Sequence, residues 1–166
     1  MFIDGQNMVL STENAPEKWQ IDLFRLRVYL RRKYEVVEAY CFVGAYRNDN
    51  EDLYSVLKRS GYTIIFREHG VKLKSKNKGN VDCDVVFEMM RNLRDRSDLF
   101  DKILLISADG DYFRTVRYLI ENERFLKILL PSHHNASSLY LKLPPEYFDY
   151  LDWRNVKKKI MRVLLR

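Results

Sequence analysis

Short apolar runs alternate with amphipathic stretches along the whole chain, and this alternation constrains the fold more than any other feature. The apolar runs predict strands at 1–3, 36–44, 62–66, 102–107 and 126–130. Strands that are apolar almost throughout are typical of a parallel sheet buried on both faces. Helices between them, joined by right-handed crossovers, form the outer layers. We therefore predict an α/β protein, a three-layer α/β/α sandwich with a parallel sheet of about five strands.

The stretches between the strands predict amphipathic helices at 21–33, 50–60, 81–95, 111–122 and 154–166. Apolar residues at helical spacing mark the inward faces. These residues are Leu23, Leu26 and Leu30; Leu53, Val56 and Leu57; Val86, Met89, Met90 and Leu93; Phe113, Val116, Leu119 and Ile120; and Val156, Ile160, Val163 and Leu164. We expect the basic segment 67–80 to be a loop and 132–150 to be irregular.

Length and composition bound the class of protein. A chain of 166 residues favours a single domain over 1–166, with 154–166 as a basic C-terminal helix. The net charge of +6 is compatible with a polyanionic partner, although many basic proteins bind none. The two cysteines form no CxxC motif, and no apolar run is long enough to cross a membrane. We expect a cytoplasmic protein without membrane contact.

Acidic residues follow or precede the predicted elements at one edge of the sheet. Asp4 ends the first strand and Asp109 ends the strand 102–107, while Asp82 and Asp111 begin the helices that come next. Ligands of parallel sheets bind outside the carboxyl ends of the strands, where the strand order reverses. If the two strands are neighbours, these four carboxylates face one crevice.

Helical geometry ranks the acids of the segment 81–95. Asp82 lies on the same side of the helix as Met89 and Leu93, which we expect to face the core. Asp84 lies about 200° from Asp82, and Glu88 is about 120° away from it. We rank Asp82 first, Asp84 second and Glu88 third.

Three of the four acids also have a purely structural explanation. Asp4 with Gly5 can form a turn, Asp111 can cap a helix, and Asp82 can interact with a helix dipole. A carboxylate at a strand end before glycine, such as Asp109, has no expected capping role. The four together favour a site, because clustered carboxylates repel unless a cation neutralises them. Oxygen ligands suit Mg²⁺ or Mn²⁺, which serve phosphodiester hydrolysis.

Three motifs carry a resemblance to a known family. The segments FIDGQN (2–7), KGNVDCDVVFEMM (78–90) and LLISADGDYFRTVRYL (104–119) resemble the NYN domain family, a branch of the PIN-like nucleases that includes LabA-like proteins. The segment LLPSHHNASSLYLKL (129–143) is similar to the tail of one bacterial subgroup. The resemblance covers nearly the whole chain.

The resemblance implies a PIN-like sheet and a Mg²⁺- or Mn²⁺-dependent ribonuclease site. The residues at the family's positions are Asp4, Asp82, Asp109 and Asp111 as catalytic metal ligands, Asp84 as a further ligand, and Asn7 and Ser107 as groups that contact substrate or water. The departures are a short first strand and Glu88, a position at which related sequences vary.

Several surface groups have an open role. A lysine recurs at every second position shortly before Asp82, at Lys72, Lys74, Lys76 and Lys78. These lysines either bind the phosphate backbone of an RNA or belong to a solvated loop. The basic flank of the last helix is either solvated or a nucleic-acid contact; it comprises Lys157, Lys158, Lys159, Arg162 and Arg166. The sequence leaves open whether His133 and His134 touch substrate, and whether Tyr46 and Tyr112 stack on bases.

The preferred hypothesis is a metal-dependent endoribonuclease that cleaves RNA and leaves a 5′-phosphate. The alternative is a non-catalytic RNA-binding or regulatory module that uses the same surface. A haloacid dehalogenase-type phosphatase is disfavoured because its D-x-D motif is replaced by Asp4-Gly5-Gln6, and dinucleotide binding because no G-x-G-x-x-G occurs. The RNA target, the choice of RNA over DNA, the preferred metal and a homodimer stay open.

Overall fold

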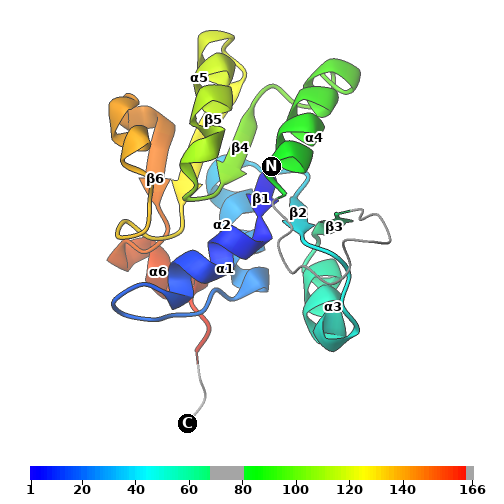
Figure 1. Ribbon diagram of the computed structural model, residues 1–166, viewed down its shortest axis with the longest axis vertical. Helices are drawn as coiled ribbons and strands as arrows, with labels where there is room; N and C mark the ends of the chain where they lie inside the picture. Colours follow the sequence, from blue (N-terminus) through cyan, green and yellow to red (C-terminus); the bar gives the residue numbers. More distant parts are fainter. Residues whose placement is uncertain (68–80, 164–166) are drawn as a thin grey trace.

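Six parallel strands form one sheet with helices on both faces, in a computed structural model that describes residues 1–67 and 81–163 (Figure 1). The strand order is β3-β2-β1-β4-β5-β6. The strands are β1 (Phe2–Asp4), β2 (Tyr40–Val43), β3 (Thr63–Phe66), β4 (Ile103–Ile106), β5 (Phe125–Leu130) and β6 (Phe148–Tyr150). Every neighbouring pair is parallel. The predicted α/β sandwich with a parallel sheet is therefore confirmed.

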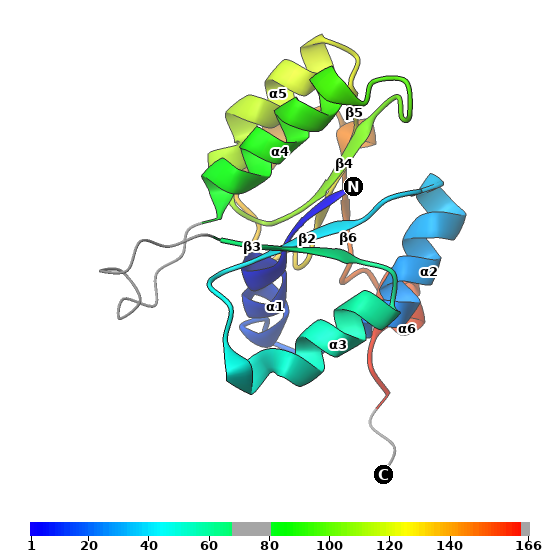
Figure 2. The ribbon, with the colours of Figure 1, turned by 90° about the vertical axis from the view of Figure 1, so that its right-hand side faces the viewer.

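The helices divide between the two faces of the sheet, as Figure 2 shows: α4 and α5 cover one face, and α1, α2, α3 and α6 cover the other. Their bounds are α1 (Gly5–Glu13), α2 (Leu23–Tyr34), α3 (Glu51–Arg59), α4 (Asp82–Asp95), α5 (Phe113–Glu121) and α6 (Arg154–Ile160). Each face of the sheet has its own apolar core, one beneath each helical layer.

Within the described residues, the helix α1 and the strand β6 were not predicted. The buried side of α1 consists of Gly5, Met8, Ser11 and Thr12, so it has no apolar stripe to reveal a helix. β6 is only three residues long and lies in a segment that we expected to be irregular. Both elements depend on tertiary packing rather than on local pattern, because α1 packs on β2 and β6 pairs with β5.

Some predicted inward faces were wrong by one position. In α3 the buried residues are Tyr54 and Leu57, whereas Leu53 and Val56 are each 41% exposed. The prediction used only aliphatic residues and left out Tyr54, which is the buried aromatic residue of this helix. Tyr54 packs against Phe66 with ring centroids 4.9 Å apart, which turns the helix toward that ring.

The inward face of α4 is also shifted, since Val85, Met89 and Asn92 are buried. Asn92 is tolerated there because its amide donates to the Glu88 carbonyl at 2.9 Å. At the C-terminus, α6 ends at Ile160 instead of continuing, and Val163 is 56% exposed. The predicted helix 154–166 is therefore too long.

The chain leaves β1 toward β2 and β3 and then returns to place β4 on the other side of β1. The strand order thus reverses between β1 and β4, which pair directly. This confirms the expected neighbourhood of the strands that end near Asp4 and Asp109. Their carboxyl ends form the switch point at which parallel sheets bind ligands.

Candidate metal centre

Four acidic side chains come together at the switch point. Asp4 is the last residue of β1, and Asp109 lies three residues beyond the end of β4. Asp111 lies in the short 3₁₀ turn Gly110–Tyr112, and Asp82 is the first residue of α4. Three separate segments of the chain therefore supply the four carboxylates, and Asp109 and Asp111 belong to the same turn.

Three of these carboxylates are close enough to share a cation. One oxygen from each of Asp82, Asp109 and Asp111 lies within 4.8 Å of the other two. Asp82 and Asp109 are partly buried, and Asp111 is exposed. Ligand oxygens of one Mg²⁺ are at most about 4 Å apart, so small side-chain rotations bring this acidic cluster to coordination distance.

Tyr112 links Asp4 to the acidic cluster. Its hydroxyl lies 2.6 Å from Asp82 Oδ1 and 3.2 Å from Asp4 Oδ2. Burial and the two carboxylates raise the pKa of Tyr112, so the hydroxyl stays protonated. With one proton, it donates to one carboxylate at a time. Tyr112 is fully buried, so the idea that it stacks on bases is wrong.

Asp4 is the most buried acid of the group, at 4% exposure. Desolvation raises its pKa from 3.8 to about 6, with Asp82 and Asp109 adding repulsion. The Asn7 N–H opposes this shift by donating to Oδ1 at 2.9 Å. The same hydrogen bond makes Asp4 the N-cap of α1, so Asp4 has a structural role as well as a place in the site.

The sequence assigned the capping role at the second strand end to the wrong acid. Asp109, not Asp111, is the N-cap: its Oδ1 accepts the Asp111 N–H at 3.0 Å. Asp109 is held further by Ser107, whose fully buried hydroxyl accepts its N–H at 3.1 Å. This contact assigns the Ser107 hydroxyl to positioning Asp109. Contact of Ser107 with substrate or water stays a prediction.

The turn around Gly110 is closed by the segment that follows β5. A Cβ on Gly110 would lie 2.6 Å from Ser137 Oγ, closer than atoms normally approach. The Tyr140 hydroxyl donates to the Asp109 carbonyl from the same segment. Glycine therefore allows close packing of this segment over the turn, and a Cβ here would force the Ser137 side chain to shift.

Asn7 joins α1 to the end of β4. Its Oδ1 accepts the Ala108 N–H at 2.7 Å and the Ser11 hydroxyl at 3.3 Å. These contacts fix the relative positions of the two strand ends that carry Asp4 and Asp109. Its predicted contact with substrate stays a prediction.

The remaining predicted residues lie outside the acidic cluster. Asp84 is partly buried, and its Oδ2 has no hydrogen-bond partner within the described residues. Glu88 is paired with Arg91 at 2.7 Å. The predicted substrate-binding residues Lys74, Lys76 and Lys78 lie outside the described residues. Lys157 of the predicted basic flank lies over the Trp19 ring at 5.5 Å, so it helps to pack α6.

The donor set fits a hard divalent cation. All the available atoms are carboxylate oxygens, the ligands that Mg²⁺ and Mn²⁺ prefer. Burial is the main cause of the raised pKa of Asp4, and repulsion from Asp82 and Asp109 adds to it. The unpartnered Asp84 Oδ2 is a further oxygen at the rim of α4. A cation at this position would relieve the repulsion within the group.

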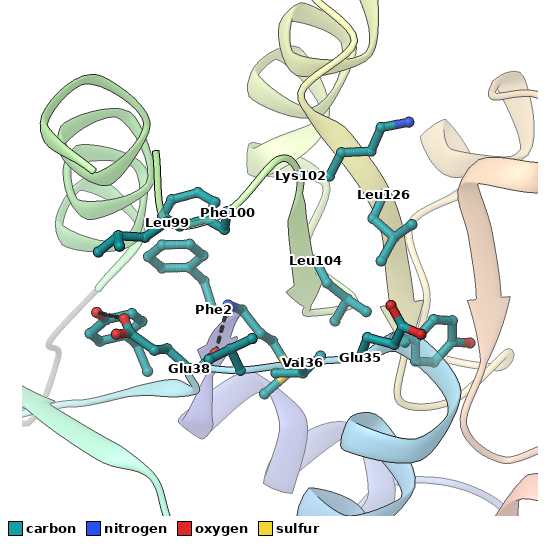
Figure 3. Close-up of a pocket in the computed structure, with 13 residues that line it drawn as sticks. Phe2, Glu35, Val36, Glu38, Leu99, Phe100, Lys102, Leu104 and Leu126 are labelled. Atoms are coloured by element: carbon teal, nitrogen blue, oxygen red, sulfur yellow. Dashed lines mark hydrogen bonds between the residues drawn. The ribbon is translucent and has the colours of Figure 1, made fainter. Parts of the chain in front are cut away.

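A pocket of about 210 Å³ lies at the opposite edge of the sheet (Figure 3). It is lined by the starts of β1 and β4 and by the segment after α2, including Phe2, Leu104 and Val36. None of the four predicted acids lines it. The acidic cluster and this pocket are therefore separate features.

A parallel sheet with clustered carboxylates at its switch point defines an α/β protein with a candidate divalent-metal centre. The chain belongs to the NYN domain family, whose model matches residues 1–150. This match confirms the resemblance seen in the three motifs. NYN domains are PIN-like and generally nuclease-like.

Two known proteins are similar to this chain over most of its length. The low amplitude and bright protein LabA of Synechococcus elongatus is 25% identical over 171 residues, which cover 98% of this chain and 88% of LabA. A crystal structure of a protein of unknown function from Vibrio parahaemolyticus matches with a TM-score of 0.73 at 17% identity, covering 97% of this chain and 93% of the other. The second similarity shows the shared fold.

No helix within residues 1–67 and 81–163 has both the length and the apolar character needed to cross a membrane.

Proposed function

We propose that this protein is a divalent-metal-dependent ribonuclease that hydrolyses RNA phosphodiester bonds internally. The observation that carries the proposal is the acidic cluster, in which oxygens of Asp82, Asp109 and Asp111 lie within 4.8 Å of one another. Membership of a nuclease-like family supports the same conclusion. The choice of RNA over DNA rests on the resemblance to the family's ribonucleases.

Mg²⁺ or Mn²⁺ would be held by Asp82, Asp109 and Asp111, with Asp4 beside them and Asp84 as an additional oxygen. Such an ion, when bound, activates water and stabilises charge on the oxygens of the phosphodiester. The exposed Asp111 is on the solvent side of the cluster, where substrate arrives.

The surrounding residues prepare the carboxylates for this task. The Tyr112 hydroxyl lies within hydrogen-bond distance of both Asp4 and Asp82 and donates to one of them at a time. Ser107 fixes the backbone of Asp109, and Asn7 fixes α1 to the end of β4. Because the pKa of Asp4 is about 6, this side chain is ionised and ready to act as a ligand above that pH.

The test is cleavage of end-labelled single-stranded and hairpin RNA, with matched DNA, in Mn²⁺, in Mg²⁺ and in EDTA. We expect metal-dependent cleavage by the wild type, with 5′-phosphate ends on the products. Asp109→Asn and Asp4→Asn should each reduce the rate by about 100-fold or more, because they remove carboxylates of the site.

Asp101→Asn is the matched control, since Asp101 is an exposed acid at the opposite edge of the sheet. It should cleave like the wild type. Equal cleavage by all four proteins would rule out the acidic cluster as the active site. Metal-dependent cleavage of DNA alone would overturn the assignment to RNA. RNA binding that survives Asp109→Asn, with no cleavage by the wild type, would instead favour a non-catalytic RNA-binding or regulatory module.

A further inference from the structure

A run of four aromatic rings lies at the ends of β5 and β6, at the same edge of the sheet as the acidic cluster. The His134 and His133 rings have centroids 3.8 Å apart and are tilted by 40°, and His133 meets Tyr150 edge to face at 6.3 Å. Tyr150 in turn lies 5.6 Å from Trp153, with the two rings tilted by 34°. We call His134, His133, Tyr150 and Trp153 the ring platform.

The ring platform is anchored by a buried carboxylate. Asp152 Oδ2 lies 2.7 Å from His133 Nδ1 and accepts the His133 N–H at 2.9 Å. The Asp152 side chain is only 7% exposed. Two contacts to one oxygen fix both the backbone and the imidazole of His133, so the position of this ring is set before any ligand arrives.

The ring platform is also open to solvent. Trp153 is 57% exposed, and the His133 side chain is 53% exposed. Packing within the protein does not account for an indole that leaves more than half of its surface in water. Aromatic rings that are held rigidly and exposed are typical of sites that stack nucleic-acid bases.

The loop after β5 leads directly from the ring platform to the metal centre. His133 contacts Asp152, Asn135 donates to the Ser11 carbonyl at 2.8 Å, and Ser137 lies against Gly110. Four residues of chain span at most about 14 Å, which bounds the separation of His133 and Ser137. A strand of a few nucleotides covers that distance.

We propose that the ring platform stacks the bases of a single-stranded RNA whose backbone continues to the acidic cluster. The identity of the strand rests on the proposed ribonuclease function. Bases in a duplex are already stacked and paired, whereas those of a single strand are free to lie on exposed rings. The net charge of +6 favours the same polyanionic partner.

Trp153 reports on this proposal directly. The chain has two tryptophans, and the other, Trp19, is 6% exposed. Titration with single-stranded oligoadenylate in EDTA, where no metal-dependent cleavage occurs, should quench the Trp153 fluorescence. Trp153→Phe should abolish the quenching. Trp153→Ala and His134→Ala should each weaken binding about fivefold or more.

Three controls make the result decisive. Tyr118→Ala removes an aromatic residue of α5 that is 51% exposed and lies outside the ring platform, and it should bind like the wild type. A strand of abasic nucleotides should not quench Trp153, and duplex RNA should quench it weakly. Equal quenching by the abasic strand would overturn base stacking in favour of phosphate contact.

Absence of quenching at RNA concentrations that are cleaved in Mn²⁺ would remove the ring platform from the substrate path and leave the ribonuclease proposal intact. Conversely, Trp153 quenching by RNA without cleavage of RNA in any metal would support base stacking on the ring platform and overturn the ribonuclease proposal.

Discussion

At the residue scale, the candidate site depends on a few atoms that hold like charges close together. Asp4 carries both a helix cap and a carboxylate that lies beside other carboxylates. Tyr112 supplies the single proton between Asp4 and Asp82. These arrangements cost free energy in the absence of a cation, because desolvated like charges repel. The clustered carboxylates therefore lower the stability of the folded protein, and a bound cation would offset this cost.

Asp4 makes this cost measurable through pH. Its folded pKa is about 6, above the ordinary value of 3.8, so the folded state binds more protons than the unfolded state between these pH values. Stability from this group is therefore present below about pH 4 and is lost as the pH rises through about 6. Across the whole pH range, this shift in the pKa of Asp4 changes the free energy of unfolding by about 3 kcal/mol.

Asp4→Asn should remove the penalty, because asparagine is neutral and still caps a helix. In EDTA, urea denaturation should show that the advantage of the variant over the wild type grows as the pH rises from about 4 to about 7. A constant difference across this range would contradict the assigned cause. Asp101→Asn, at an exposed position, should show no such growth.

Tyr112→Phe tests the shared hydroxyl. The variant keeps the buried ring but leaves Asp4 and Asp82 without their common donor. We expect a loss of about 1–3 kcal/mol in the free energy of unfolding in EDTA, measured by urea denaturation at neutral pH. Tyr118→Phe removes an exposed hydroxyl instead and should cost almost nothing. Equal losses for the two variants would show that the bridge does not contribute to stability.

At the element scale, the placement of α1 decides where Asp4 points. The helix begins directly after β1, and its first residue, Gly5, lies against β2. A Cβ on Gly5 would lie 2.7 Å from the Phe42 carbonyl oxygen and 3.1 Å from Cys41 Sγ. The first contact is with the backbone of β2, which is paired on both sides and cannot move aside cheaply. The close approach of α1 therefore requires glycine.

Gly5→Ala should thus displace α1 and destabilise the protein by about 1–3 kcal/mol. Gly44→Ala is the matched control, because a Cβ at Gly44 meets no atom within 4 Å. Both variants carry the same Gly→Ala change, so their midpoints of thermal denaturation can be compared directly. If Gly5→Ala is as stable as Gly44→Ala, the packing of α1 on β2 tolerates a side chain and the argument fails.

At the scale of the whole molecule, the sheet topology brings together groups that are far apart along the chain. The reversal between β1 and β4 unites residues 4, 82, 109 and 111. The ends of β5 and β6 extend the same edge to the ring platform. The pocket at the opposite edge is lined by other residues. One edge of the sheet thus carries both the proposed chemistry and the proposed binding surface.

A cation that binds only the folded protein should stabilise the whole molecule. At a concentration about 100-fold above the dissociation constant, the gain is about 2.7 kcal/mol. Mn²⁺ should therefore raise the midpoint of urea denaturation of the wild type and of Asp101→Asn. The rise should be much smaller for Asp109→Asn. A similar rise for all three proteins would place the bound metal outside the acidic cluster.

The sequence by itself determined the layered α/β architecture and pointed to the acids of the candidate site. Buried parallel strands leave almost continuous apolar runs, and the acids at their ends stand out against them. Local pattern failed where contacts distant in sequence dominate. It missed α1, whose buried face is small and polar, and β6, which is a strand because it pairs with β5.

Only the tertiary structure showed which groups each of these side chains contacts. It showed that Asp109 caps its own turn, that Tyr112 is buried between two carboxylates, and that Asp152 holds His133. A tyrosine that follows an aspartate gives no sign in sequence of the direction in which its hydroxyl points. That direction depends on the packing of α4 beside β1 and beside the turn Gly110–Tyr112, which brings Asp82 and Asp4 to the same hydroxyl. Sequence spacing therefore identifies the candidate ligands, and the packing of distant segments determines which of them share a proton, a backbone contact or a cation.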